Sequence, residues 1–541
     1  MTVAVRDKLQ TSTLATDILS GVEKAVPDEV IEFINTTVTS MGKGTFYNMA
    51  EEQRAALLAK HLPVLKASRP LYTLMMLPPG VTDINKQLII YNLLRTSATL
   101  ETEQHGGPTQ KLWENAVMLE TLKNMRSNRA LNLGFQFTKG VVTSEDGGVA
   151  VRPGIHNRRT KKLMRQYLEE NRSSLSLWFV KYQRQMRSWA RHLHLGTDFH
   201  PGVSFLFDSY QGGDRLIDGY LKVQQAEAKQ WYKLSPGVKE AFKSLPFTVA
   251  EGFLTKFGLT RKKLLEMFSE EQEEGKPARG MTKRERLRQK SEGERSGVDT
   301  GVKLEKLDLW DLLVFLNQEA RTNNRTRQGS ANLLQKAAQR VGRKLGLQFN
   351  DVAVVMDTSL SMIGTQDSQY HPLLRGMAVR YILESVSETF AEFRTTDSDT
   401  VFPILHGQSN YAAAILKALK AGFKNIVVIG DGYENAPFEG AAHQLIWTFK
   451  KKIDTDDGVS FIHLNPVFAA ESKDVRALSD LAPTAGVLDH KNLGTAIYLA
   501  MSKSNPAAAL KLYIKWLIEG QSEGTRELMQ SAGVTQQMLL P

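Results

Sequence analysis

The stretch Val352-Ala353-Val354-Val355-Met356-Asp357-Thr358-Ser359-Leu360-Ser361 decides the fold of the C-terminal part of the chain. Its five apolar residues have the length and composition of a buried parallel strand, and polar residues follow at once. The loop after such a strand lies at the carboxyl edge of the sheet, the usual ligand position in open α/β folds. The Asp357 carboxylate and the Ser359 and Ser361 hydroxyls in that loop suit Mg²⁺, which prefers oxygen ligands.

Strands and helices are predicted to alternate from residue 351 onwards. After the strand at 352–356, we expect helices at 373–390, 411–421 and 438–451, strands at 426–429 and 459–464, and further helices after residues 473 and 493. Residues 391–405 form a poorly defined extended region. This alternation predicts a doubly wound, mostly parallel α/β sheet that helices cover on both faces.

Residues 1–345 are predicted to be mainly helical. Leu, Ala and Met mix with Glu and Lys at helical spacing in segments such as 51–66, 85–95, 112–126 and 307–319. Short links that contain Pro or Gly separate these segments, which favours an all-α, HEAT-like helical-repeat module, although no clean sequence period confirms the repeat. We therefore expect two domains, at residues 1–345 and 346–541.

The charge of the chain is unevenly distributed. Residues 1–350 carry 53 Lys and Arg against 37 Asp and Glu, whereas residues 351–541 carry 16 against 21. A basic body indicates a polyanionic partner. The chain has no cysteine, which excludes disulfides and thiolate metal sites. Because no signal pattern or membrane segment is evident, we expect a cytoplasmic protein without a membrane partner.

The strongest candidate for a phosphate-binding surface lies between residues 158 and 194. Apolar residues from Leu175 to Leu193 recur every three or four positions, which predicts a helix that packs on one side and presents cations on the other. Such a cationic stripe is typical of surfaces that bind a phosphate backbone, although a solvated basic face without a partner is the main alternative. The candidate residues are Arg158, Arg159, Lys161, Lys162, Arg165, Lys181, Arg184, Arg187 and Arg191.

Two further charged segments follow. Residues 269–306 combine dense charge with low hydrophobicity, which predicts an exposed, mobile internal loop. Residues 321–345 then return to a basic pattern in a polar loop and a helix, and they form a second candidate phosphate-binding face. Its candidate residues are Arg321, Arg325, Arg327, Lys336, Arg340 and Arg343.

Two later segments add oxygen ligands to the first metal loop. Ser409 precedes the helix expected at 411–421, and Asp431 follows the apolar strand at 426–429. Together with Asp357, Ser359 and Ser361, these side chains resemble the metal-ion-dependent adhesion site of a von Willebrand factor A domain. Ser409 stands where this motif usually has threonine; it retains the hydroxyl group that would face the metal.

A basic, helical body of about 345 residues followed by an A domain resembles the Ro 60 kDa family, in which a TROVE helical-repeat ring is closed by the A domain. Asp431-Gly432-Tyr433-Glu434-Asn435 is similar to the Asp-x-x-Glu loop of Ro proteins. The resemblance implies a bacterial or phage Ro-like, monomeric ring that binds small non-coding RNA of the Y type and single-stranded 3′ ends of misfolded RNA. It also implies an exoribonuclease partner such as polynucleotide phosphorylase, in RNA quality control or processing.

Two other functions compete with this one. In the first, the chain is a metal-dependent protein-interaction scaffold that acts through the A domain without RNA. In the second, it is a metal-dependent hydrolase, but no general base or nucleophile–histidine pair lies near the metal loop in the sequence. We therefore expect a non-enzymatic protein with a divalent cation, Mg²⁺, as its cofactor.

Overall fold

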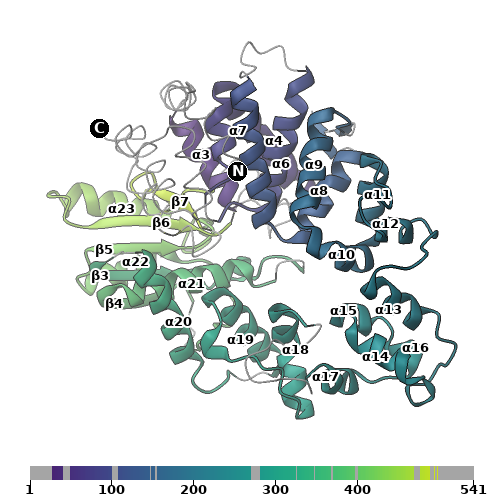
Figure 1. Ribbon diagram of the computed structural model, residues 1–541. Helices are drawn as coiled ribbons and strands as arrows, with labels where there is room; N and C mark the ends of the chain where they lie inside the picture. Colours follow the sequence, from purple (N-terminus) through teal and green to yellow (C-terminus); the bar gives the residue numbers. More distant parts are fainter. Residues whose placement is uncertain are drawn as a thin grey trace. The chain divides into compact units, whose positions relative to one another are not determined.

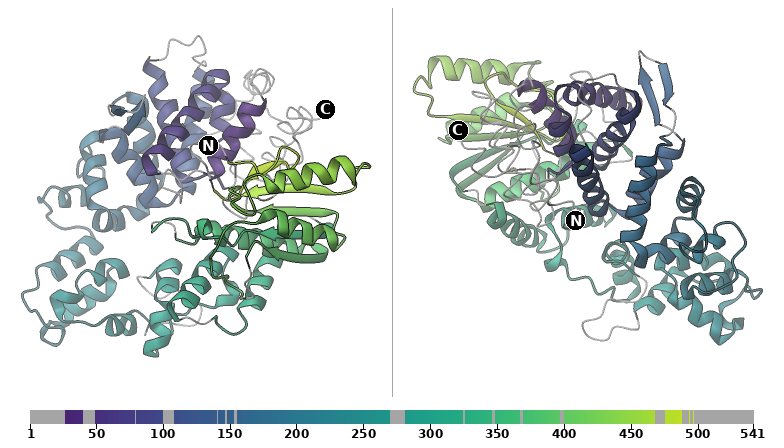
Figure 2. Two further views of the ribbon diagram at one scale, coloured as in Figure 1. Left: turned by 180° about the vertical axis from the view of Figure 1, so that it is seen from behind. Right: turned by 45° about the horizontal axis from the view of Figure 1, so that its top comes forward.

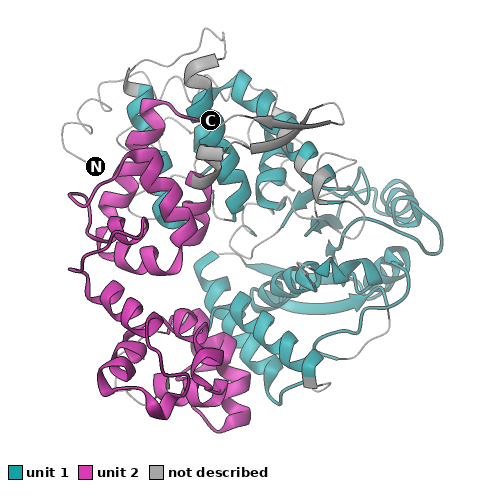
Figure 3. Cartoon of the chain, turned by 90° about the vertical axis from the view of Figure 1, so that its right-hand side faces the viewer, with its two compact units in different colours: residues 1–125, 142–152, 307–541 teal, residues 126–141, 153–306 magenta. Residues whose placement is uncertain are grey.

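The computed structural model describes residues 27–39, 49–78, 80–99, 108–139, 141–145, 148–152, 155–269, 281–323, 326–345, 348–366, 369–396, 400–467 and 475–487, with residues 493 and 496. These residues form two compact units (Figure 3). Unit 1 comprises residues 1–125, 142–152 and 307–541, and unit 2 comprises residues 126–141 and 153–306. The units therefore do not follow the sequence segments 1–345 and 346–541, because unit 1 takes helices from the basic body as well as the α/β part.

Unit 1 begins with helices, as the sequence predicts. Pro63 lies inside α4, and Ser68 both ends that helix and caps the next one by accepting a hydrogen bond from the Leu71 N–H. A short two-stranded sheet, which the sequence does not predict, follows the helices. These elements are α3 (Pro27–Thr39), α4 (Ala50–Ala67), α5 (Arg69–Leu74), α6 (Asp83–Thr99), α7 (Pro108–Asn124), β1 (Val141–Glu145, whose first residue belongs to unit 2) and β2 (Gly148–Arg152).

A buried polar network joins the first helices. His61 of α4 contacts the Tyr72 hydroxyl at 2.6 Å through Nδ1 and the Asn85 side-chain oxygen at 3.0 Å through Nε2. The Asn85 amide donates to the backbone oxygens of Thr36 and Thr37 in α3. Arg69 and Glu114 form a buried ion pair between α5 and α7. Because each of these groups has a hydrogen-bond partner, burial does not leave it unsatisfied.

The rest of unit 1 is the predicted α/β part. The sheet is five-stranded and all parallel, in the order β4-β3-β5-β6-β7. Helices cover both of its faces, as the two views in Figure 2 show. The elements are α19 (Leu309–Asn323), α20 (Ser330–Leu345), β3 (Phe349–Met356), η4 (Leu360–Ile363), α21 (His371–Ser385), β4 (Ser387–Arg394), α22 (Tyr411–Lys420), β5 (Asn425–Ile429), α23 (Ala441–Lys452), β6 (Ser460–Asn465) and β7 (Thr484–Gly486).

Alternation along the central strands explains the two layers. Ala353 and Val355 of β3 point to the face that α22 and α23 cover, where Ile415 and Ile446 pack in the same apolar cluster. On the opposite face, Gly376 of α21 lies so close to Met356 that a β-carbon would overlap its side chain. The expected helix at 373–390 ends at Ser385, because the following residues form β4. Residues 475–487 form β7 and irregular structure instead of the helix expected after residue 473.

The first described helix lies beside the last strand of the sheet (Figure 1). The Asn35 side-chain oxygen of α3 accepts a hydrogen bond of 2.9 Å from the Gly486 N–H of β7. A β-carbon at Gly486 would overlap the Thr39 methyl group, so glycine allows this close approach. The edge strand of the sheet is therefore covered by a helix from the other end of the described chain.

Unit 2 is helical. The structure corrects one expectation here: residues 283–296 form helix α18, not an irregular loop, while residues 270–280 lie outside the described part. Thr282 and Glu285 form a capping box at its start, and Glu285 pairs with Lys181 at 3.0 Å. The elements are α8 (Ser127–Lys139), α9 (Arg158–Glu170), η1 (Arg172–Ser174), α10 (Leu175–Lys181), α11 (Gln183–Leu193), α12 (Gly202–Phe205), α13 (Arg215–Gln224), η2 (Trp231–Lys233), α14 (Pro236–Ser244), α15 (Phe247–Glu251), α16 (Leu254–Phe257), α17 (Arg261–Ser269), α18 (Lys283–Ser296) and η3 (Leu304–Lys306). None of the described helices is long and apolar enough to cross a membrane.

Candidate functional site

The first loop of the candidate metal site follows β3. Asp357, Ser359 and Ser361 are all buried at the carboxyl edge of the sheet. Asp357 Oδ1 accepts a hydrogen bond of 2.9 Å from the Ser359 N–H, which turns the chain back over the end of the strand. The hydroxyl oxygens of Ser359 and Ser361 lie 3.0 Å apart. The D-x-S-x-S segment therefore places its three polar side chains together.

The second loop brings Ser409 to the same place. Its hydroxyl donates a hydrogen bond of 2.8 Å to the Ser359 hydroxyl, 50 residues earlier in the chain. Two residues later, at the first position of α22, the buried Tyr411 hydroxyl donates to Asp357 Oδ2 at 2.6 Å. This contact of Tyr411 is not predicted from the sequence. Its position directly after the Ser409 loop was the only available signal.

The third loop supplies Asp431, the residue that follows the second central strand. Its Oδ1 accepts a hydrogen bond of 3.0 Å from the Tyr433 N–H. Its Oδ2 is buried and has no hydrogen-bond partner among the described residues. The preceding Gly430 has no room for a side chain, because a β-carbon there would overlap the Tyr411 hydroxyl. Asp431 is thus held close to Tyr411 and Asp357 with one oxygen unsatisfied.

The electrostatics of this cluster favour a bound cation. Burial raises the pKa of Asp357. Burial and the nearby Asp357 carboxylate raise the pKa of Asp431 well above its usual value. Two buried carboxylates repel each other unless a proton or a cation compensates their charge. Two carboxylates and three hydroxyls are oxygen donors of the kind that Mg²⁺ takes, so the residues fit a divalent cation.

The described residues contain no group of three or more His, Cys, Asp or Glu side chains that could hold a metal ion. The cluster at the sheet edge has only two acidic members. The remaining donors would be the hydroxyls of Ser359, Ser361 and Ser409, whose oxygens form a continuous chain of contacts. The five predicted metal-site residues therefore lie together, and their ability to bind a cation remains a prediction.

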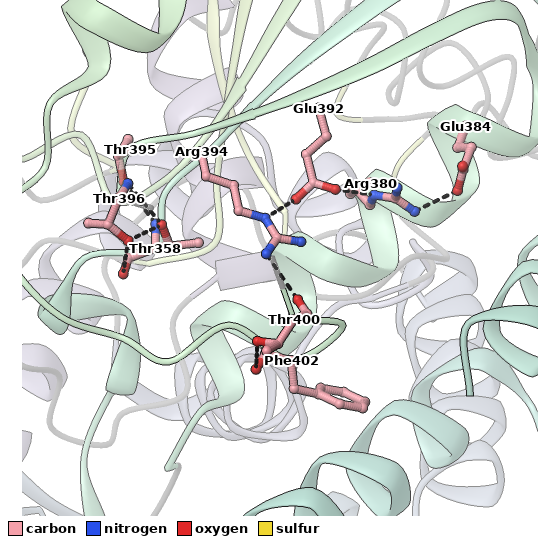
Figure 4. Close-up of polar contacts among 9 residues, drawn as sticks. All are labelled: Thr358, Arg380, Glu384, Glu392, Arg394, Thr395, Thr396, Thr400 and Phe402. Carbon is pink, nitrogen blue, oxygen red and sulfur yellow. Dashed lines mark hydrogen bonds and ion pairs between the residues drawn. The ribbon is translucent and has the colours of Figure 1, made fainter. Parts of the chain in front are cut away.

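A fourth loop, after β4, supports the first one (Figure 4). The Thr395 hydroxyl donates to Asp357 Oδ1 at 3.1 Å. The hydroxyls of Thr358 and Thr396, both drawn in Figure 4, lie 2.7 Å apart. Arg394 anchors the same segment by donating to Glu392 at 2.6 Å and to the Thr400 backbone oxygen at 2.9 Å. These threonines are not predicted from the sequence, because their contact with the metal loop depends on the pairing of β3 with β4.

Glu434 of the Asp-x-x-Glu loop connects two helices. Its carboxylate accepts hydrogen bonds from the Ala412 N–H at the start of α22 and from the Ala442 N–H at the start of α23. Burial raises the pKa of this carboxyl. The two helix N-termini provide the partial positive charge that stabilises a carboxylate in such a position. Glu434 therefore fixes the loops around the cluster instead of joining it.

The basic stretch at 158–194 is not one continuous helix. It is broken at Asn171 and at Tyr182, which end α9 and α10 with non-helical backbone angles. Asn171 favours such an end because its side-chain amide donates to the Tyr167 backbone oxygen. Trp178 and Trp189 are buried, as their helical spacing predicts, and Tyr182 is half-buried. The single cationic stripe expected from the sequence is therefore divided among separate helices.

Two of these helices still present cations opposite an apolar face. On α9, Arg158, Lys162 and Arg165 are exposed, whereas Leu163 and Tyr167 are buried. Arg159 and Lys161 are half-buried. Arg165 also contacts Glu169 at 3.4 Å and lies over the Phe199 ring. These helices pack against each other through the rings of Tyr167 and Trp189, whose centroids are 5.9 Å apart.

On α11, the cations follow the same three-to-four spacing. Arg184 and Arg191 are exposed, and Arg187 is half-buried, with a buried Nε that has no hydrogen-bond partner among the described residues. Arg191 lies over the Phe207 ring. By contrast, Lys181 of α10 is committed to Glu285. Among the candidate cations of residues 158–191, the exposed ones therefore lie on α9 and α11.

The second candidate face, in unit 1, is mostly engaged in internal contacts. Arg321 donates to the Pro403 backbone oxygen at 2.7 Å, and Arg327 makes a two-bond contact with Glu319. Arg340 donates to the Leu307 backbone oxygen at 2.6 Å, although it is exposed. Lys336 and Arg343 are exposed on α20. Arg325 lies outside the described residues. The guanidinium groups of Arg321 and Arg327 are engaged in hydrogen bonds within the chain, so they are poorer candidates for RNA contact than the exposed Lys336 and Arg343.

Comparison with solved structures finds a similarity to a known protein. The chain is similar to the crystal structure of the Ro (RSR) protein of Deinococcus radiodurans, with 13% sequence identity and a TM-score of 0.43. The similarity covers 88% of this chain and 100% of that one. No family model and no curated protein matches the sequence. At this level of similarity, function has to be argued from the residues of the chain itself.

Proposed function

We propose that the chain is a non-enzymatic RNA-binding protein. Its ligands on this proposal are small non-coding RNA of the Y type and the single-stranded ends of misfolded RNA, in cytoplasmic RNA quality control or processing. An exoribonuclease such as polynucleotide phosphorylase would be its protein partner. The observation that carries the proposal is the pair of neighbouring helices α9 and α11, each of which buries one face and exposes Lys and Arg on the other.

The charge on these helices is suited to a phosphate backbone. Each Lys or Arg that neutralises a phosphate releases condensed counterions, which favours binding and makes it depend on salt. Residues 158–191 of the sequence contain ten Lys and Arg but only two Glu. Few carboxylates are therefore available on α9 and α11 to neutralise these cations, and the surface can accept a polyanion. Arg side chains can also stack on unpaired bases, which suits RNA.

The salt dependence of RNA affinity tests this proposal. We expect the logarithm of the association constant for a structured RNA to fall steeply with the logarithm of salt concentration. Replacing Arg158, Lys162 and Arg165 by Ala should weaken binding and reduce the slope by about 2 to 3, roughly one for each lost phosphate contact. A triple replacement of the exposed Lys417, Lys420 and Lys451 by Ala is the matched control. Equal losses in both triple variants, or salt-independent binding, would contradict the proposal.

A second candidate function rests on the cluster at the sheet edge. There, the unsatisfied oxygen of Asp431 and the buried Asp357 favour a divalent cation, Mg²⁺, which could take an acidic group of a protein partner as a further ligand. On this alternative, the chain is a metal-dependent interaction scaffold. Asp357→Ala separates the two functions, since it should abolish partner binding but leave the RNA affinity of α9 and α11 nearly unchanged.

A further inference from the structure

A short turn in unit 2 displays an aromatic ring to solvent. Residues Trp231–Lys233 form η2, between α13 and α14. Its backbone is closed by hydrogen bonds from Lys233 N–H to the Gln230 oxygen and from Leu234 N–H to the Trp231 oxygen. Trp231 packs on the buried Phe242 with ring centroids 5.1 Å apart, and Leu234 is buried. These two anchors turn Tyr232, which lies between them, outwards.

Tyr232 is the most exposed aromatic side chain in the described chain, at 71%. Its hydroxyl donates a hydrogen bond to the neighbouring Gln230 side chain, which holds the ring in place. The backbone on either side is fixed by the half-buried Trp231 and the buried Leu234. The ring is therefore a preorganised flat surface, and little conformational entropy would be lost when another ring stacks on it.

Two lysines lie close to this turn. Lys233 Nζ lies 5.8 Å from the centre of the Tyr232 ring, and Lys239 Nζ lies 6.0 Å from the centre of the Trp231 ring. Lys239 also donates to the Tyr232 backbone oxygen at 3.5 Å. Residues 222–243 contain only two glutamates. Within the described part of the chain, no ion pair is formed by any of the five lysines of this segment, Lys222, Lys229, Lys233, Lys239 and Lys243.

We propose that the η2 turn binds an unpaired nucleobase of a single-stranded nucleic acid. The base would stack on the Tyr232 ring, while the lysines around it would contact the adjoining phosphates. Aromatic rings among cations are the usual means of holding single strands without reading their sequence. A duplex keeps its bases stacked inside, so it has no base to offer this ring.

The surroundings of Tyr232 favour nucleic acid over a protein ligand. An aromatic residue at the centre of a protein interface normally lies among apolar and near-neutral contacts that exclude water. Tyr232 lies instead beside Lys233 and Lys239, which form no ion pair in the described structure, so a ligand that carries regular negative charge complements them. This inference rests on the proposed RNA-binding function, but it uses different elements from α9 and α11.

The test compares a labelled oligouridylate of about 12 nucleotides with an RNA duplex of similar length, by fluorescence anisotropy with the full chain. We expect Tyr232→Ala to weaken oligouridylate binding about 10-fold or more and to leave duplex affinity within about twofold. The salt slope should not change, because no charge is lost. Tyr232→Phe should retain binding, which would show that the ring and not the hydroxyl is required.

Trp447→Ala provides a matched control, since Trp447 is an exposed aromatic residue of α23 one turn before the exposed Lys451. It should leave both affinities unchanged.

The inference is overturned if Tyr232→Ala has no effect, if it weakens duplex binding equally, if Trp447→Ala has the same effect, or if the wild-type chain does not bind oligouridylate. Loss of binding in the α9 triple variant together with an unaffected Tyr232→Ala variant would overturn only this inference and leave the proposed function standing. The converse result is that Tyr232→Ala weakens single-strand binding alone while the α9 triple variant binds RNA as the wild type does. It would overturn only the proposal that α9 contacts RNA.

Discussion

Asn35 and Gly486, which are 451 residues apart in the chain, are joined by a hydrogen bond from the Gly486 N–H to the Asn35 side-chain oxygen. The bond is buried, and it connects α3 to the edge strand β7. It therefore ties a helix of the basic body to the sheet that carries the candidate metal cluster. Both elements belong to unit 1.

We expect Asn35→Ala to lower the free energy of unfolding by about 1–3 kcal/mol, because the buried Gly486 N–H loses its acceptor. Gly486→Ala should destabilise the chain as well, since the new methyl group would overlap Thr39. Urea unfolding followed by circular dichroism measures both effects. Asn350→Ala, at an exposed position of β3, is the control. A destabilisation no larger than that of the control would show that the contact contributes little.

The candidate metal cluster predicts that the effect of Asp431→Asn on thermal stability depends on whether a divalent cation is present. In EDTA, Asp431→Asn should raise the melting temperature, because it removes the repulsion between two buried carboxylates. Added Mg²⁺ should stabilise the wild-type chain by about 2.7 kcal/mol at a concentration 100 times the dissociation constant, and it should not stabilise the variant. Thermal unfolding with and without Mg²⁺ gives both quantities. An equal Mg²⁺ response in wild type and variant would exclude a cation at Asp431.

The buried His61 predicts an acid-sensitive fold. Burial lowers its pKa from 6.5 to about 4, so the unfolded chain binds a proton in this range that the folded chain does not. Stability should therefore fall as the pH falls from about 6.5 to 4, by roughly 3 kcal/mol from this group. Urea unfolding over this pH range should show a shallower dependence for His61→Gln, while the exposed His406→Gln serves as the control. Parallel curves for wild type and His61→Gln would contradict the assignment.

The buried Arg69–Glu114 pair predicts strong non-additivity. Arg69→Met alone should cost about 3–5 kcal/mol of stability, because it leaves the fully buried Glu114 without its counter-charge. The double replacement Arg69→Met with Glu114→Leu should recover most of that loss, since both charges are removed together. A double-mutant cycle from chemical denaturation measures the coupling. Additive losses would show that the two side chains do not act as a pair.

The α/β part could be predicted well from sequence, because each central strand is a short apolar run whose last residue leads into a polar loop. Asp357 and Asp431 could be assigned to one site because parallel strands end at the same sheet edge. Tyr411, Thr395 and Glu434 could not, since their roles depend on which strands are neighbours and on where two helices begin. No local pattern encodes those distances.

The basic body was harder to predict. Charge and apolar spacing indicated helices at 158–194, but not the breaks at Asn171 and Tyr182, which depend on tertiary packing and local side-chain contacts. The highly charged α18 was mistaken for a loop because its stability comes from a capping box and from the long-range contact between Lys181 and Glu285. Tyr232 carries no sequence signal of exposure, since the half-buried Trp231 beside it is also aromatic.

The contact between α3 and β7 also constrains the order in which the protein can be completed during synthesis. Unit 2 is encoded between segments of unit 1, so all its residues leave the ribosome before β7 is made. More than 400 further residues must be synthesised after α3 before its partner strand β7 exists. Contacts between residues so far apart in the chain form slowly. We therefore expect nascent chains to hold a folded unit 2 while the surface of α3 that later covers β7 is still exposed to chaperones.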